Sequence, residues 1–229
     1  ARVRLALSPT LLDASRLHRA QHASPREDDG SAPTPGLLLN ARACTSSRSS
    51  QKVVVSEAVC RGWKIISADI SKAFLQGVTY KELAELTGEA PREINFYLPP
   101  QDVPLLRQLP GFENFDPATE VLHYDKPGTG LADAPRAFQV KLTRILTTKC
   151  DMKQSKIDSE LCLRHDRGAL TCIMTIHVDD LKIAGKPHVV KQLLKELQLV
   201  FGELTIQEGT FTNCGVQHVQ DPRTLEITL

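Results

Sequence analysis

Two short stretches decide the fold of this chain: SADISKAFLQG at residues 67–77 and IHVDDLKIAG at residues 176–185. The first places Asp69 near the end of an apolar segment, and the second places Asp179 and Asp180 side by side between two apolar arms. Carboxylates from separate elements can converge on divalent cations, as phosphoryl transfer by the two-metal route requires. The sequence therefore predicts a magnesium site made of these three aspartates.

The segments around these stretches alternate between helix and strand patterns. Helices are expected where apolar residues recur at helical spacing between capping and stop signals, at 50–62, 79–88, 133–150 and 187–202. In the third of these, Asp133 is the expected cap and Pro135 a first-turn residue. Strands are expected at 63–70, 93–100, 119–125, 159–165, 169–178, 181–185, 203–207, 210–218 and 224–229. From residue 159 onward they predict a meander with HVDD at a tight turn.

Composition narrows the classes of protein that this chain can be. Its 229 residues and 41% hydrophobic content are enough for a buried core. No run of 18 apolar residues and no signal-peptide pattern is present, so we expect a globular intracellular protein without a membrane span. The six cysteines are scattered, which favours reduced thiols over a disulfide framework or a zinc site. A formal net charge of +1 implies that any nucleic-acid site is local.

The amino-terminal region differs from the rest of the chain. Residues 1–48 contain seven Arg and no Lys, and the stretch 23–36 is rich in Pro, Ser, Gly and acidic residues. Such a stretch is typical of a linker or loop without a packed core. We therefore expect residues 1–48 to be a poorly ordered or truncated region and residues 49–229 to form the folded core.

Three strings in a fixed order resemble the reverse transcriptase domain of Copia-type long-terminal-repeat retrotransposons. That family carries an AFLNG-like string after an aspartate strand, then a GLKQAPRAW-like string, then YVDD. Here the strings are DISKAFLQG at 69–77, GLADAPRAF at 130–138 and HVDDLKIAG at 177–185. Each string alone is weak, but their order and spacing are specific, and the similarity covers roughly residues 41–220.

The resemblance implies a fold and an activity. The fold is α+β, a right-hand polymerase palm in which helices back an antiparallel sheet, with partial fingers in the first part and the start of the thumb at the carboxyl end. The activity is RNA-directed DNA polymerisation, the two-metal transfer of deoxynucleotides to a primer 3′ hydroxyl. By matching position, Asp69, Asp179 and Asp180 would be the catalytic residues and would hold two Mg²⁺ ions, with Mn²⁺ as a substitute.

The resemblance also implies roles for residues around the aspartates. Phe74 matches the aromatic gate that excludes a ribose 2′ hydroxyl. The other nucleotide-binding and pocket positions that it implies are Gln76, Arg136 and Val178 for the nucleotide, and His177, Gly130 and Pro135 for the pocket. The implied partners are an RNA or DNA template, a DNA primer, deoxynucleoside triphosphates and other parts of a Gag-Pol polyprotein, with no membrane. The implied location is the cytoplasm, in virus-like particles, or the nucleus.

Three departures from the family pattern lower the expected affinity for nucleotides. His177 replaces the tyrosine before VDD, and Ala132 and Asp133 replace a Lys-Gln pair, which removes a positive charge near an anionic substrate. A basic fingers segment like the family's has no convincing counterpart upstream; residues 1–10 are a poor candidate.

Simpler interpretations remain open for single residues. Asp69 is also compatible with a turn cap, and the Asp179–Asp180 pair with an ordinary hairpin turn. Phe74 is compatible with a core aromatic, and Arg136 with a solvated helix charge. For the whole chain, the alternatives are a catalytically inactive polymerase-like module that binds nucleic acid or protein, and another two-metal enzyme such as a nuclease.

Overall fold

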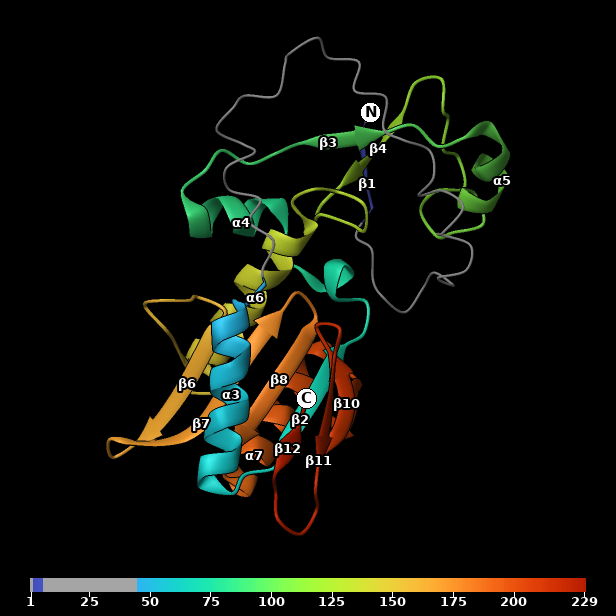
Figure 1. The fold of residues 1–229 in the computed structure, drawn as a ribbon. Coiled ribbons are helices and arrows are strands. Elements are labelled where there is room, and N and C mark those ends of the chain that lie inside the picture. Colours follow the sequence, from blue (N-terminus) through green and yellow to red (C-terminus); the bar gives the residue numbers. More distant parts are fainter. Residues whose placement is uncertain (1, 6–44) are drawn as a thin grey trace. The chain divides into compact units, whose positions relative to one another are not determined.

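The computed structural model describes residues 2–5 and 45–229, and it divides the chain into two compact units (Figure 1). The first unit comprises residues 1–42 and 74–138, and the second comprises residues 43–73 and 139–229. The prediction of poor order over residues 1–48 falls mostly outside the described residues, so it stays a prediction. The two units are described separately below.

The second unit is built on a six-stranded sheet in which every neighbouring pair is antiparallel. The strand order is β5-β6-β7-β8-β2-β9. The bounds are β2 Ile65–Ile70, β5 Lys153–Gln154, β6 Leu161–Asp166, β7 Ala169–His177, β8 Asp180–Gly185 and β9 Leu204–Glu208. The predicted meander is confirmed by β6, β7 and β8, whereas the short β5 was not predicted. The centre of this sheet carries both aspartate stretches.

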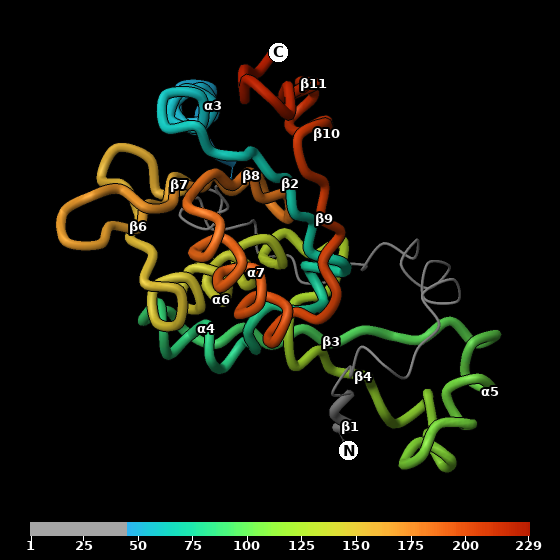
Figure 2. The backbone as a smooth tube through the Cα atoms, turned by 90° about the horizontal axis from the view of Figure 1, so that it is seen from below, coloured from blue at the N-terminus to red at the C-terminus, as the bar shows by residue number. Residues whose placement is uncertain are grey.

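Helices cover both faces of this sheet. Helix α3 (Arg48–Arg61) packs on β7 and β8 from one side, and α7 (Pro187–Phe201) packs on them from the other (Figures 1 and 2). The hydroxyl of Ser47 caps α3 by accepting a hydrogen bond from the Ser50 N–H, and Gly62 ends the helix in the left-handed conformation. Both helices were predicted; in α7 the predicted apolar stripe supplies the buried residues Val190, Leu193 and Leu197, whereas α3 buries Val54, Val55 and Ala58 and leaves Val53 and Val59 exposed.

The two faces of the sheet differ in chemistry because side chains alternate along a strand. On β8, Leu181 and Ile183 are buried on the α7 side. Asp180, Lys182 and Ala184 point to the α3 side, where Ala184 packs with residues of α3 in an apolar cluster. The aspartates therefore lie on the α3 face of the sheet, beyond the end of that cluster.

A hairpin completes the second unit. Its strands are β10 (Thr210–Asn213) and β11 (Val216–Gln220), with β12 (Ile227–Thr228) pairing on β11. The prediction of one strand over 210–218 is wrong, because Cys214 and Gly215 both have positive φ and reverse the chain. The predicted strand 224–229 is reduced to the two residues of β12. Figure 2 shows this hairpin on the same side of the sheet as α3.

The first unit contains a small three-stranded sheet in the order β1-β4-β3, where β1 (Arg2–Leu5) runs parallel to β4 (Val121–Tyr124) and β3 is Ile94–Phe96. Its other elements are η1 (Ala73–Gln76), α4 (Tyr80–Thr87), η2 (Pro100–Asp102), α5 (Val103–Leu106) and the start of α6 (Ala134–Thr148). The prediction of α4 is confirmed with its capping box at Thr79 and its stop at Gly88. The strand β1 and the short helices η2 and α5 were not predicted.

A buried carboxyl in the second unit makes its stability depend on pH. Glu160 is 4% exposed; its Oε1 accepts hydrogen bonds from Gln139 and Ser159, but its Oε2 is buried without a partner among the described residues. Burial raises the pKa of Glu160 above its ordinary value of 4.5. Because the folded-state pKa is the higher one, the stabilisation is present at acidic pH and is lost as the pH rises through that pKa.

We therefore expect Glu160→Gln to stabilise the protein by about 1 kcal/mol at pH 8, with less effect at pH 4, because the amide removes a buried charge and keeps a polar group in its place. Thermal unfolding at the two pH values checks this. The matched control is Glu203→Gln, since Glu203 is exposed. An equal gain in both variants would contradict the assignment of the effect to burial.

Candidate active site

Strand pairing brings two of the three predicted aspartates together. Asp69 on β2 and Asp180 on β8 are direct register partners. Asp179 lies in the turn between β7 and β8, and its carbonyl oxygen accepts a hydrogen bond from the Ile70 N–H at 3.3 Å. This bond ties the turn to the end of β2. The predicted tight turn at HVDD is confirmed, and all three aspartates lie at one end of two adjacent strands.

The carboxylates act on one another electrostatically. The pKa of Asp69 is raised by burial and then by the negative charges of Asp179 and Asp180. The pKa of Asp180 is raised by burial and by Asp179, while nearby His177 lowers it. Partly buried carboxylates that repel one another are stabilised when they bind protons or cations. The site therefore has the electrostatic character of a cation site.

The protein side chains alone do not form a closed metal cage. Among the described residues, no group of three or more His, Cys, Asp or Glu is placed to hold a metal ion by itself. A magnesium ion in a nucleotide-processing site is usually held by one or two carboxylates together with water and substrate phosphates. The residues present fit that open kind of site, in which the substrate completes the coordination.

The turn that carries Asp179 is strained. Val178 has a φ of +61°, in the left-handed region, which is costly for a β-branched residue. Strained backbone of this kind tends to occur at functional sites, where the surrounding structure holds it in place. Here the turn is held by β7 and β8 on either side and by the hydrogen bond from the Ile70 N–H to the Asp179 carbonyl oxygen.

We expect Val178→Gly to raise the free energy of unfolding by up to about 1 kcal/mol or leave it unchanged, because relief of strain is offset by the entropy of the unfolded glycine. If the aspartates bind Mg²⁺, the same change should weaken that binding, because glycine lets the turn adopt more conformations. Denaturant unfolding and Mg²⁺ titration by calorimetry check the two effects. Unfolding that becomes easier by several kcal/mol would show that the strain was not present.

His177 lies beside the carboxylates. It is the register partner of Asp180 at the end of β7, and its Nδ1 is buried without a hydrogen-bond partner among the described residues. The ring is thus neither a solvated surface group nor a fully satisfied core residue. The Nδ1 without a partner and the lowering of the Asp180 pKa by His177 are compatible with the predicted pocket role, which stays a prediction.

The structure does not bring all predicted site residues into one group. His177, Val178 and the aspartates belong to the second unit. Five others belong to the first unit: Phe74, Gln76, Gly130, Pro135 and Arg136. Phe74 is half-buried in η1, so both the gate and the core interpretation of this ring stay open. The approach of this second group to the aspartates stays a prediction.

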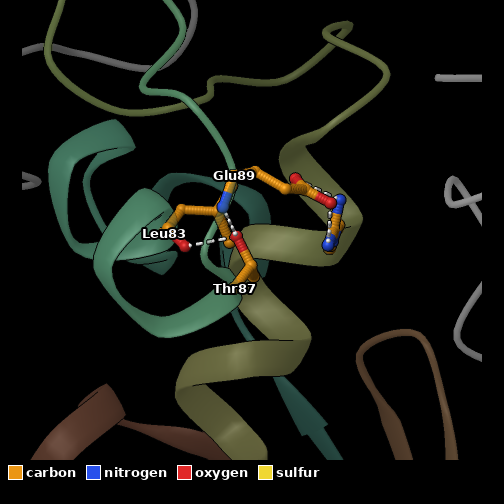
Figure 3. A network of polar contacts seen from close by, with 4 residues as sticks. Leu83, Thr87 and Glu89 are labelled. Carbon is orange, nitrogen blue, oxygen red and sulfur yellow. Dashed lines mark hydrogen bonds and ion pairs between the residues drawn. The ribbon is translucent and has the colours of Figure 1, made fainter.

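Arg136 is held by an ion pair within the first unit. Its Nη1 and Nη2 donate to the two carboxylate oxygens of Glu89, each at 2.9 Å. Glu89 is positioned by the end of α4, where the Glu89 N–H donates to the Thr87 hydroxyl and that hydroxyl donates to the Leu83 carbonyl (Figure 3). The guanidinium is therefore paired rather than freely solvated.

Asp133, the expected cap of α6, has other partners. The helix begins at Ala134, so Asp133 stands at the cap position, but its carboxylate accepts hydrogen bonds from Arg92 at 3.2 Å and from the Tyr80 hydroxyl at 3.3 Å. The carboxylate thus joins α6 to α4 and to the segment that follows it.

The sequence interpretation missed Lys182 as a residue of interest. Lys182 is 2% exposed at the centre of the sheet, and it pairs with Thr175 on β7 and Ser67 on β2. Thr175, Lys182 and Ser67 therefore form a polar row across three strands. This row lies two residues along the strands from the row of His177, Asp180 and Asp69. The signal that could have found it is the string DDLKIAG, since a lysine two residues after Asp180 in a buried strand must face the same side.

Comparison with known proteins relates this chain to retrotransposon proteins. It is similar to two proteins of Arabidopsis thaliana. One is the Retrovirus-related Pol polyprotein from transposon RE2, 32% identical over 141 residues, which are 62% of this chain and 8% of that protein. The other is the Retrovirus-related Pol polyprotein from transposon RE1, 31% identical over 153 residues, which are 66% of this chain and 9% of that protein. This chain thus spans less than a tenth of the length of these curated relatives.

These matches confirm the resemblance that the three strings indicated: the chain is related to the Pol polyproteins of retrotransposons, consistent with the Copia type. No protein-family model matches the chain, and no solved structure matches it. In the described part of the chain, none of the helices has the length and apolar character needed to cross a membrane.

Proposed function

We propose that this chain is the polymerase core of a retrotransposon Pol polyprotein and catalyses RNA-directed DNA synthesis, with the second unit as the palm. The observation that carries the proposal is the register of β2 and β8, which pairs Asp69 with Asp180 and sets Asp179 in the adjoining turn. An antiparallel sheet backed by helices supports the assignment of the palm. The relation to Pol polyproteins supports the retroelement origin.

The aspartates have defined tasks in this proposal. Asp69, Asp179 and Asp180 would hold two magnesium ions, which supply activation of the primer 3′ hydroxyl and neutralisation of the triphosphate and the departing pyrophosphate. The protein contributes position: β2 and β8 fix two carboxylates, and the strained turn fixes the third. His177, on the neighbouring strand β7, lowers the pKa of Asp180. Phe74, in the first unit, would select deoxynucleotides by bulk.

A primer-extension experiment tests the proposal. A DNA primer annealed to an RNA template is incubated with the protein and deoxynucleoside triphosphates, in Mg²⁺ and separately in Mn²⁺. Extension by added nucleotides is the expected result, and repeating the reaction with ribonucleotides tests the role of Phe74. A folded protein that binds the duplex and extends it in neither metal would overturn the proposal.

A second candidate function is a catalytically inactive module that binds nucleic acid or protein. The observation that favours it is the bidentate pair of Arg136 with Glu89, which occupies a guanidinium that the family resemblance assigns to nucleotide binding. The near-neutral net charge of +1 points the same way. Duplex binding without extension, measured by fluorescence anisotropy beside the extension reaction, identifies this function.

A further inference from the structure

Two polar side chains are buried between the sheet and the β10–β11 hairpin. Lys182 on β8 is 2% exposed and His218 on β11 is 1% exposed. The Lys182 Nζ and the His218 Nε2 are 3.2 Å apart, which is a hydrogen bond. Burial lowers the pKa of Lys182 to about 8. Lysine is rarely buried without a partner, so this contact calls for an explanation.

The surroundings of His218 define which atom donates. The His218 Nδ1 lies 3.0 Å from the Val216 carbonyl oxygen, which can only accept, so Nδ1 carries the proton. The Nε2 is then an acceptor, and Lys182 donates to it. The ring stacks on Phe211 with centroids 4.9 Å apart, and Phe211 packs with Val55 and Ile65 in the core. The acceptor is therefore held in one position.

The contact lies directly behind the carboxylates. Lys182 and Asp180 face the same side of β8 and are about 6.6 Å apart along the strand. At the end of the hairpin, Gln51 on α3 accepts a hydrogen bond from the Thr175 hydroxyl at 3.3 Å, and Thr175 is the register partner of Lys182. Gln51 on α3 completes the contact surface: its Nε2 donates to the Cys214 Sγ at 3.5 Å.

We propose that Lys182 and His218 are positioning residues that fix the β10–β11 turn, residues 213–215, against the aspartate end of β8. The turn then forms one wall of the carboxylate site. This inference rests on the proposed function for its catalytic consequence, but the docking of the hairpin stands on the contact itself. Asn213, at the start of this turn, is itself 2% exposed, so the turn is packed against the rest of the unit rather than free in solvent.

A purely structural role predicts a different outcome from a positioning role. Replacing a buried polar pair by apolar groups of similar size is often neutral or stabilising for a fold. If the pair only fills space, the double variant Lys182→Met/His218→Leu, which leaves neither group unpaired, should behave like the wild type in every assay, whereas a positioning role predicts faster exchange in residues 210–220 for this variant too. If the hydrogen bond fixes the hairpin, its loss should loosen the hairpin selectively while the helices on the sheet keep their stability.

Three single variants, used beside that double variant, separate these cases. His218→Leu removes the acceptor, His218→Gln keeps an acceptor oxygen, and Lys182→Met removes the buried charge while keeping the bulk of the stem. Lys191→Met on the exposed face of α7 is the matched control. The first readout is hydrogen exchange of the peptide 210–220, with α7 as the internal reference. The second is primer extension, with the KM for the primer–template duplex separated from kcat.

We expect His218→Leu and Lys182→Met to speed hydrogen exchange in residues 210–220 by about tenfold, as for the loss of one hydrogen bond to a charged group, with α7 unchanged. His218→Gln and Lys191→Met should match the wild type. In primer extension, the KM for the duplex should rise by about tenfold in the first pair while kcat changes little. Equal exchange in His218→Leu and His218→Gln, equal acceleration in α7, or an unchanged KM would overturn the proposal.

The exchange measurement needs no polymerase activity. If the wild-type protein fails to extend any primer, the proposed function is overturned, and the hairpin contact is still decided by hydrogen exchange. If the wild type extends primers and the exchange of residues 210–220 is the same in all variants, only the positioning role is overturned.

Discussion

Asp179→Asn is expected to lower the rate of primer extension by about a thousandfold, which corresponds to about 4 kcal/mol of transition-state stabilisation. The substitution keeps the shape of the side chain and removes one of three clustered negative charges. Asp179 also raises the pKa of both Asp69 and Asp180, so its charge acts on the whole site. Single-turnover extension, with Mg²⁺ varied over a wide range, measures the loss.

The same variant should be at least as stable as the wild type when no divalent cation is present. Repulsion among the three carboxylates opposes folding, and a neutral amide relieves part of it, by about 0.5–1 kcal/mol. Asp166→Asn is the matched control, because Asp166 is an exposed acid at the end of β6. Lower stability in Asp179→Asn with normal extension would remove the aspartates from the proposed site.

The sequence predicted those parts of the fold in which local pattern and tertiary burial agree. Helix α7 carries a regular apolar period, and in the structure Val190, Leu193 and Leu197 of that period are buried. The turn at Val178 and Asp179 was also predicted, because two apolar arms flank a polar pair. The sequence predicted that the three aspartates come together, but not that Asp69 pairs directly with Asp180, since sequence spacing does not specify which distant strands are neighbours.

The features that the sequence did not reveal depend on contacts between distant residues. Lys182 reads as a surface lysine until β11 supplies His218 as its partner from 36 residues away. The hairpin at Cys214 was read as one strand because its left-handed turn uses a cysteine before Gly215, a weak turn signal. The pairing of Arg136 with Glu89 likewise joins segments 47 residues apart. Each of these features needed the three-dimensional structure.

Gly185→Ala is expected to destabilise the protein by about 3 kcal/mol, the upper range for overpacking a core. An added Cβ at Gly185 would lie 2.8 Å from the Thr171 carbonyl oxygen and 3.0 Å from the Cα of Cys172. Both contacts are with backbone, and the Thr171 carbonyl also accepts the Lys186 N–H at 2.9 Å, so β7 cannot move away cheaply. Thermal unfolding measures the loss.

Gly128→Ala is the control for this prediction, because a Cβ there meets only ordinary contacts at 3.6 Å or more and should change stability by less than about 0.5 kcal/mol. The consequence of Gly185→Ala for function follows from the register of β8. A displacement of β8 away from β7 at Gly185 would also disturb the pairing of β8 with β2, which sets Asp180 beside Asp69. Primer extension should therefore fall even at temperatures where the Gly185→Ala variant is folded. If the variant instead has the full stability of the wild type, β7 and β8 are not packed as closely as this register requires.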